Sequence, residues 1–210
     1  MTSQVTDQRI LEAEDFGNAL SRLVNGRNLT TNDRNRQKIR AAAAAFGIAQ
    51  DHHHAIVFLL KYTFHSSSLA LLRSVFEAYV RGLWLRRCAT DAQVQKVMEE
   101  KEPPPNDIMI TAIEALPDFG EGTLARIKKH GWKEMCDFAH TGGLHLQRWQ
   151  SQDGIEPTFD PAELEACLNY AELLAAMSGL EVVQMSEGGS NGQAVLELIE
   201  KRWPPSPAVI

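Results

Sequence analysis

The amino-acid sequence predicts an all-α protein, an antiparallel helical bundle of four main helices plus several short helices. Two observations lead to this fold class. Apolar residues recur at helical spacing along most of the chain, and capping residues, glycines and prolines mark the ends of each segment. No segment alternates apolar and polar residues as a strand would, and there is no internal repeat. We expect a single helical domain over residues 1–203 and a flexible, proline-rich tail over residues 204–210.

The first two main helices are expected over residues 6–25 and 30–64. Apolar residues form one helical stripe in the first segment, and Gly26 supplies its stop signal. The second segment starts at Thr30 and Asp33, which are three residues apart and resemble a capping box. Both segments are therefore predicted to pack one apolar face against the rest of the bundle.

The third main helix is expected to be the central element, over residues 66–88. Its three consecutive serines, at positions 66–68, are candidate N-terminal caps. Apolar residues cover nearly its whole circumference, which is typical of a helix buried in the middle of a bundle. They include Leu69, Leu71, Leu72, Val75, Phe76, Ala78, Val80, Leu83 and Leu85.

Several short helices are expected before the fourth main one. One covers residues 92–101, and after three prolines Asn106 can cap a second, which ends near Leu116. Two more, residues 123–130 and 132–140, are predicted to be separated at Gly131. A turn at residues 141–143 and a surface loop over residues 151–159 follow.

The clearest start signal belongs to the fourth main helix. Asp160 is its expected cap, Pro161 occupies the first helical position and Glu163 the third. This helix is predicted to end before Gly188 and Gly189, and a last short helix covers residues 191–203.

The net charge of −6 and the pI of about 5.6 give no general attraction to phosphate backbones or anionic membranes. Nucleic-acid binding stays open, because a negative net charge does not exclude a local basic patch. The three cysteines form no CxxC pair, and the N-terminus lacks the order of a signal peptide. The most apolar stretch, residues 66–85, contains three charged residues, which disfavours a membrane span. We therefore expect a cytoplasmic protein without a membrane partner.

Arg73, Glu77 and Arg81 are spaced four residues apart, so they are expected along one face of the central helix. His65 extends this row backwards. Two interpretations stay open: a salt-bridged stripe at the helix surface, or a partly buried polar groove or dimer seam.

Histidines supply the other candidate chemistry. Asp137 and His140 lie one turn apart, an arrangement that suits acid–base catalysis or an ordinary helix end. A mononuclear metal site using His54, His65 and His140 is an open alternative, although the sequence predicts no metal or cofactor set. Phosphate-binding loops, dinucleotide-binding fingerprints, nucleophile elbows and His-Glu-x-x-His are all absent from the sequence.

The segment from Ser67 to Ala78, together with Cys136-Asp137-Phe138-Ala139-His140, resembles a group of uncharacterised bacterial helical proteins related to the HEPN superfamily. The resemblance implies a helical bundle, homodimerisation and a link to bacterial defence or toxin systems. It also implies a polar cluster formed by Arg73, Glu77 and His140. HEPN ribonucleases have four to six residues between an arginine and a following histidine, whereas Arg126 and His130 have three between them.

The function expected from these observations is a dimeric binding or interaction protein that takes a protein partner or a small ligand. The alternative is a metal-independent ribonuclease-type toxin, in which His140 acts as acid–base and Arg73 stabilises phosphate charge. The candidate catalytic residues are Arg73, Glu77 and His140, and the candidate binding residues are His65, Arg81 and Asp137. We expect Arg73 and Glu77 to face His140 across the bundle.

Overall fold

The computed structural model describes residues 7–101, 103–120, 122–187 and 192–204. These residues form helices and connecting loops, with no β-strand in the described ranges and one isolated bridge between Leu29 and Ser186. The predicted all-α class is confirmed. Residues 205–210 of the expected tail, the stop signal at Gly188 and Gly189, and Asn191 lie outside the described residues.

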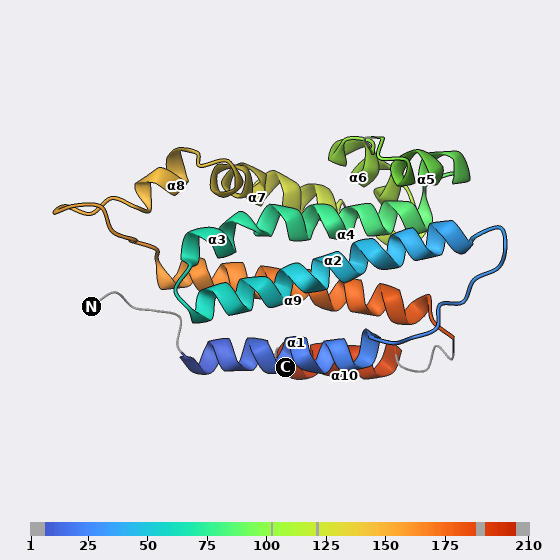
Figure 1. Cartoon of the computed structure of the whole chain (residues 1–210), viewed down its shortest axis with the longest axis horizontal. Helices are drawn as coiled ribbons and strands as arrows, with labels where there is room; N and C mark the ends of the chain where they lie inside the picture. Colours follow the sequence, from blue (N-terminus) through green and yellow to red (C-terminus); the bar gives the residue numbers. More distant parts are fainter. Residues whose placement is uncertain (1–6, 102, 121, 188–191, 205–210) are drawn as a thin grey trace, which may run out of the picture.

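Four long helices lie side by side: α1 (Asp7–Val24), α2 (Arg36–Lys61), α4 (Leu72–Arg87) and α9 (Pro161–Gln184), and α10 (Gly192–Arg202) lies next to α1 (Figure 1). The colours in Figure 1 show that α2 runs opposite to α1, α4 and α9. Because α4 and α9 run in the same direction, the expected antiparallel four-helix arrangement is not confirmed. The reason is the long segment between them, which returns the chain to the end of the bundle at which α4 begins.

That returning segment forms an outer layer over α4, and its first helix also contacts α2 (Figure 1). Its helical elements are α5 (Asp91–Met98), α6 (Asn106–Glu114), η1 (Pro117–Phe119), α7 (Thr123–Ala139) and α8 (Gly143–Gln147). Two helices of this layer are thinly packed, since α7 buries only Leu124, Met135 and Phe138 and α5 buries Val94, whereas the shorter α6 buries three large side chains.

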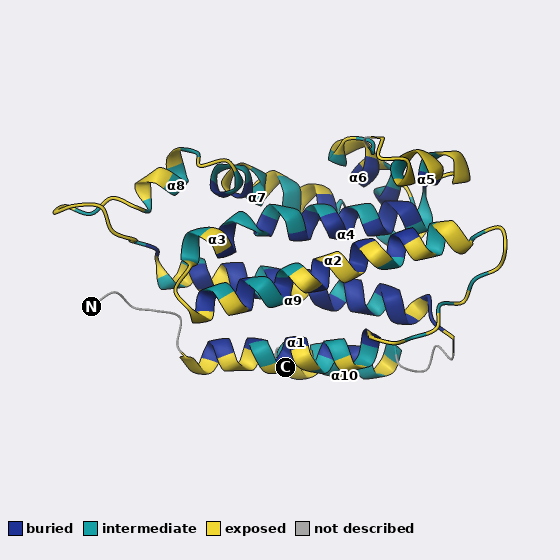
Figure 2. Cartoon of the chain, in the orientation of Figure 1, coloured by how far each residue is buried: buried dark blue, intermediate teal, exposed yellow. Residues whose placement is uncertain are grey.

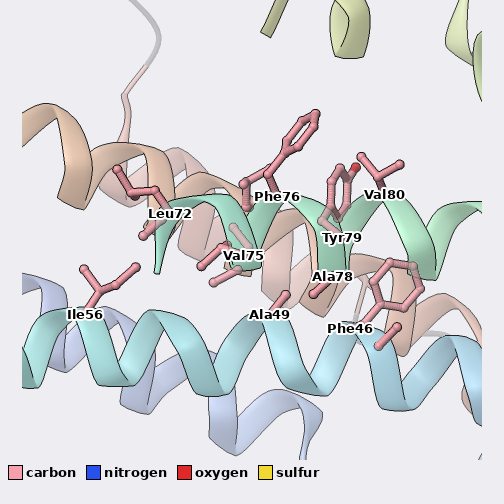
Figure 3. Close-up of a cluster of buried hydrophobic side chains, with 14 of the residues drawn as sticks. Phe46, Ala49, Ile56, Leu72, Val75, Phe76, Ala78, Tyr79 and Val80 are labelled. Carbon is pink, nitrogen blue, oxygen red and sulfur yellow. The ribbon is translucent and has the colours of Figure 1, made fainter. Parts of the chain in front are cut away.

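The core is centred on α2, α4 and α9, which together carry most of the dark blue ribbon in Figure 2. Val75 and Ala78 point from α4 toward α2, whereas Phe76 and Val80 point toward the outer layer (Figure 3). This two-sided burial confirms that the central helix lies inside the bundle. One contact sets how closely α2 and α4 approach: an added Cβ on Gly82 would lie 2.5 Å from the ring of Phe46, so only glycine fits there.

α9 is the only helix in the described part of the chain that is long and apolar enough to cross a membrane. Of its apolar stretch, 67% is buried inside the protein. Its apolar character is therefore compatible with the core helix of a soluble protein.

Several helix boundaries differ from the sequence-based expectation. α2 covers residues 36–61 rather than 30–64, and α5 covers residues 91–98 rather than 92–101. The predicted helix over residues 66–88 is divided into α3 (His65–Ala70) and α4, because the Leu71 N–H donates to Ser68 in a tight turn. The segment 123–140, expected as two helices, forms the single helix α7 through Gly131, which ends at Ala139 with His140 as its C-cap. A helical glycine costs about 1 kcal/mol relative to alanine, and the buried side chains of α7 offset that cost.

Three predicted caps are wrong and one is confirmed. Thr30 and Asp33 do not start α2, which begins at Arg36 after Asn35. No serine caps α3, which begins at His65 after Phe64. The side chain of Asn106, expected to cap α6, bonds elsewhere, and Pro105 precedes that helix. Asp160 caps α9 as expected, since its carboxylate accepts a hydrogen bond of 2.8 Å from the Ala162 N–H.

Candidate functional site

Arg73 is the centre of a polar cluster between α4 and the end of α7. Its Nε donates a hydrogen bond of 2.9 Å to Oε1 of Glu77. Its Nη1 lies 2.5 Å from Nε2 of His140 and 3.7 Å from Sγ of Cys136. The structure therefore brings Arg73, Glu77 and His140 together, as expected from the sequence. Their functional roles remain predictions.

The end of α7 fixes the position of His140. The His140 N–H donates to the carbonyl of Cys136, and the Gly142 N–H reaches back to the carbonyl of Asp137 at 2.7 Å. Thr141 between them has a positive φ of 56°. The left-handed Thr141 and the bond from Gly142 to Asp137 correspond to the outer bond of a Schellman C-cap. Because the closing bond lies directly after His140, the imidazole is held at the point where α7 meets α4.

Trp132, Lys128 and Asn106 complete the cluster, and the sequence-based reasoning missed all three. The Arg73 guanidinium lies 4.8 Å from the centre of the Trp132 ring, and the Lys128 ammonium lies 4.7 Å from it. Asn106 Nδ2 donates to Oε1 of Glu77 at 3.3 Å. One signal in the sequence could have revealed the α7 residues. Positions 128, 132, 136 and 140 are each four residues apart, but a helix break assumed at Gly131 hides this row.

The hydrogen bond to Glu77 raises the pKa of Arg73 further, so its guanidinium is charged at neutral pH. Nη1 can donate to His140 only if Nε2 of that imidazole is unprotonated, which puts the ring hydrogen on Nδ1. Nη2 of Arg73 makes no hydrogen bond within the described ranges. The cluster thus offers one unused pair of charged donors beside an exposed histidine.

Comparison with known proteins gives one result. The model of a family of unknown function, DUF6988, matches residues 46–203, which include all the residues of this cluster. The chain belongs to the DUF6988 family. No curated protein and no solved structure matches it, and no link to the HEPN superfamily is shown.

Three predicted binding residues of this DUF6988 chain lie apart from the Arg73 contacts. Arg81 lines a groove with α2 and α5, because successive steps of four residues rotate the row around α4 by about 40° each. His65 packs edge-on against Phe159 at 5.5 Å, and its partial burial lowers its pKa. The side chain of Asp137 lies against Gly142, and no hydrogen bond joins it to His140.

The alternative metal site is not assembled. His54 Nε2 lies 2.9 Å from Oγ of Ser21, His65 contacts Phe159 and His140 contacts Arg73. Across the residues that the structure describes, no three His, Cys, Asp or Glu side chains are grouped so that they could hold a metal ion.

Proposed function

We propose that this DUF6988 protein is a binding protein, and that Arg73, Trp132 and His140 recognise a carboxylate or phosphate group of its partner or ligand. The observation that carries the proposal is the unused Nη2 of Arg73. Its neighbour Nη1 is occupied by His140, and Nε is occupied by Glu77. A guanidinium held in this way is pre-positioned to donate to an incoming oxyanion, at little further cost in side-chain entropy.

Binding fits the cluster better than catalysis does. A catalytic histidine needs a free ring nitrogen directed at its substrate and a second group that orients the ring. Nε2 of His140, the ring nitrogen that could accept a proton, is already occupied by Arg73, and Asp137 makes no hydrogen bond that would orient the ring. The cluster is also open, since the side chains of Arg73 and Glu77 are 27% and 26% exposed. The ribonuclease-type activity is kept as the alternative function. The proposal also includes a cytoplasmic location and a link to bacterial defence or toxin systems.

Titration with inorganic phosphate, followed through the NMR signals of the His140 ring, tests the site. We expect a saturable shift of those signals, and Arg73→Met should weaken phosphate binding at least about tenfold, because it removes a charge-assisted donor. Arg34→Met is the matched control, since Arg34 is exposed and lies outside the cluster. Equal shifts in the Arg73→Met protein would contradict the proposal. RNA cleavage that disappears in His140→Ala would support the alternative instead.

We also propose that the protein is a homodimer, and an aromatic patch at the end of α2 supports this part of the proposal. Phe58, Tyr62 and Phe64 are 58%, 54% and 58% exposed, and the rings of the first two lie 4.8 Å apart. Neighbouring exposed aromatic side chains are typical of protein interfaces. Light scattering should give the mass of a dimer, and Phe58→Glu should shift it toward the monomer mass. Ile155→Glu, in an exposed loop, should not change the mass. A monomer in the unaltered protein would contradict this part.

A further inference from the structure

A second polar surface lies away from the Arg73 cluster, in a groove between the first half of α2, the last part of α4, and α5. The groove has a volume of about 740 Å³ and is lined by Ala41, Ala44, Ala45, Ile48, Leu85, Val97, Met98, Gln37, Asp33, Arg36, Arg40 and Arg81. Its volume is within the range of small-molecule sites. None of these residues contacts Arg73, Glu77 or His140 through a hydrogen bond or ion pair.

The arginines of this groove have few counter-charges. Arg36 is 3.6 Å from Asp33, and both side chains are largely exposed, so this pair is weak. Arg40 and Arg81 form no hydrogen bond or ion pair with any residue in the described part of the chain. The Nε atom of Arg81 is moreover buried without an acceptor.

Unpaired cations in one groove are unexpected in a chain with a net charge of −6, which has spare carboxylates elsewhere. A buried donor without a partner costs free energy that an incoming acceptor would recover. The groove is therefore complementary to an anion.

Apart from Asp33 and Gln37, the rest of the lining is apolar. The alanines of α2 form a smooth floor, and the rims carry Ile48 and Met98, which are 51% and 55% exposed. Exposed apolar side chains next to unpaired arginines match a molecule that has both a charged and a hydrocarbon part.

We propose that this groove binds a single-chain anionic amphiphile, such as a medium-chain carboxylic acid. The carboxylate lies at Arg40 and Arg81, and the hydrocarbon chain lies along the alanine floor toward Ile48 and Met98. The ligand is a free molecule rather than a lipid in a bilayer, because three helices bound the groove and a flat membrane would reach only its rim. This site is separate from the one in the proposed function.

Calorimetric titration of the full chain with decanoate tests this proposal. We expect saturable binding that is stronger for decanoate than for acetate, which lacks the chain, and than for decanol, which lacks the charge. Arg81→Gln and Arg40→Gln should each weaken decanoate binding at least about tenfold. Lys129→Gln is the matched control. It removes the same charge from α7, outside the groove, and should leave the affinity unchanged.

Several results would overturn the proposal. Acetate binding as tightly as decanoate would reduce the site to a simple anion site, and decanol binding equally well would reduce it to an apolar patch. Binding only to phosphatidylglycerol vesicles, without binding to free decanoate, would identify a membrane surface. If Arg81→Gln fails to fold, Arg40→Gln decides, because Arg40 is exposed on α2. The phosphate titration of His140 is independent of all these results.

Discussion

Glu172→Ala is expected to lower the free energy of unfolding by about 3–5 kcal/mol, the usual cost of breaking a buried ion pair on one side. Glu172 on α9 is fully buried, and its carboxylate accepts from Arg9 of α1 at 2.6 and 3.1 Å. Arg202 of α10 donates to the same carboxylate at 3.1 Å. Removing it leaves two guanidiniums facing each other without the negative charge between them. Urea denaturation followed by circular dichroism measures the loss.

Glu165→Ala is the matched control for this measurement, because Glu165 is exposed on the same helix. Its effect should stay within about 0.5 kcal/mol. A triple variant, Arg9→Met with Glu172→Leu and Arg202→Met, should recover most of the stability, since apolar residues of similar size often replace a buried ionic group without loss. A loss below about 1 kcal/mol in Glu172→Ala would show that the network does not hold α1 and α10 to α9.

Acid is expected to destabilise the protein through His53. This residue is 1% exposed on α2, and its Nε2 has no hydrogen-bond partner within the described residues. Burial, followed by the charges of His54 and Arg9, lowers its pKa from 6.5 to about 3. The unfolded chain therefore binds a proton between these pH values that the folded chain excludes. Stability falls as the pH drops through this window, by about 1.4 kcal/mol per pH unit.

Urea denaturation at several pH values between 7 and 4, repeated on His53→Leu, measures the contribution of His53 to the loss of stability in acid. Carboxylates also contribute to acid sensitivity, so the decisive quantity is the difference in slope between the two proteins. In His53→Leu, the slope of the free energy of unfolding against pH should be smaller by about 1.4 kcal/mol per pH unit, the contribution of one proton. His52→Leu, at the less buried neighbouring position, should keep the slope of the unaltered protein. Identical slopes in all three proteins would mean that His53 is protonated without unfolding.

Most of the helices, but only part of the site, could be predicted from the sequence. The apolar circumference of residues 72–85 identified the central helix, because burial on all sides needs such a pattern. The direction of α9 relative to α4 could not be predicted, since it depends on how the outer layer returns the chain. The break at Leu71 depends on one tight turn, and no glycine or proline marks it.

For the site, a local pattern predicted one half and a resemblance predicted the other. Arg73 and Glu77 follow from their spacing within one helix. His140 lies far away in sequence, and its contact with Arg73 depends on how α7 packs against α4. Trp132 was missed because Gly131 was interpreted as a helix end. Arg81 was included in the row because the rotation over two successive steps of four residues was neglected.

The thin packing of α7 limits the lifetime of the Arg73 cluster. The cluster joins a core helix to a helix that buries only three side chains, so its two halves belong to parts of different stability. Amide hydrogen exchange would then show α7 opening at a lower free energy than α4. Each such opening separates His140 from Arg73 while the bundle stays folded. A partner that contacts both residues would select the closed state, so its affinity would include the free energy of ordering this outer layer.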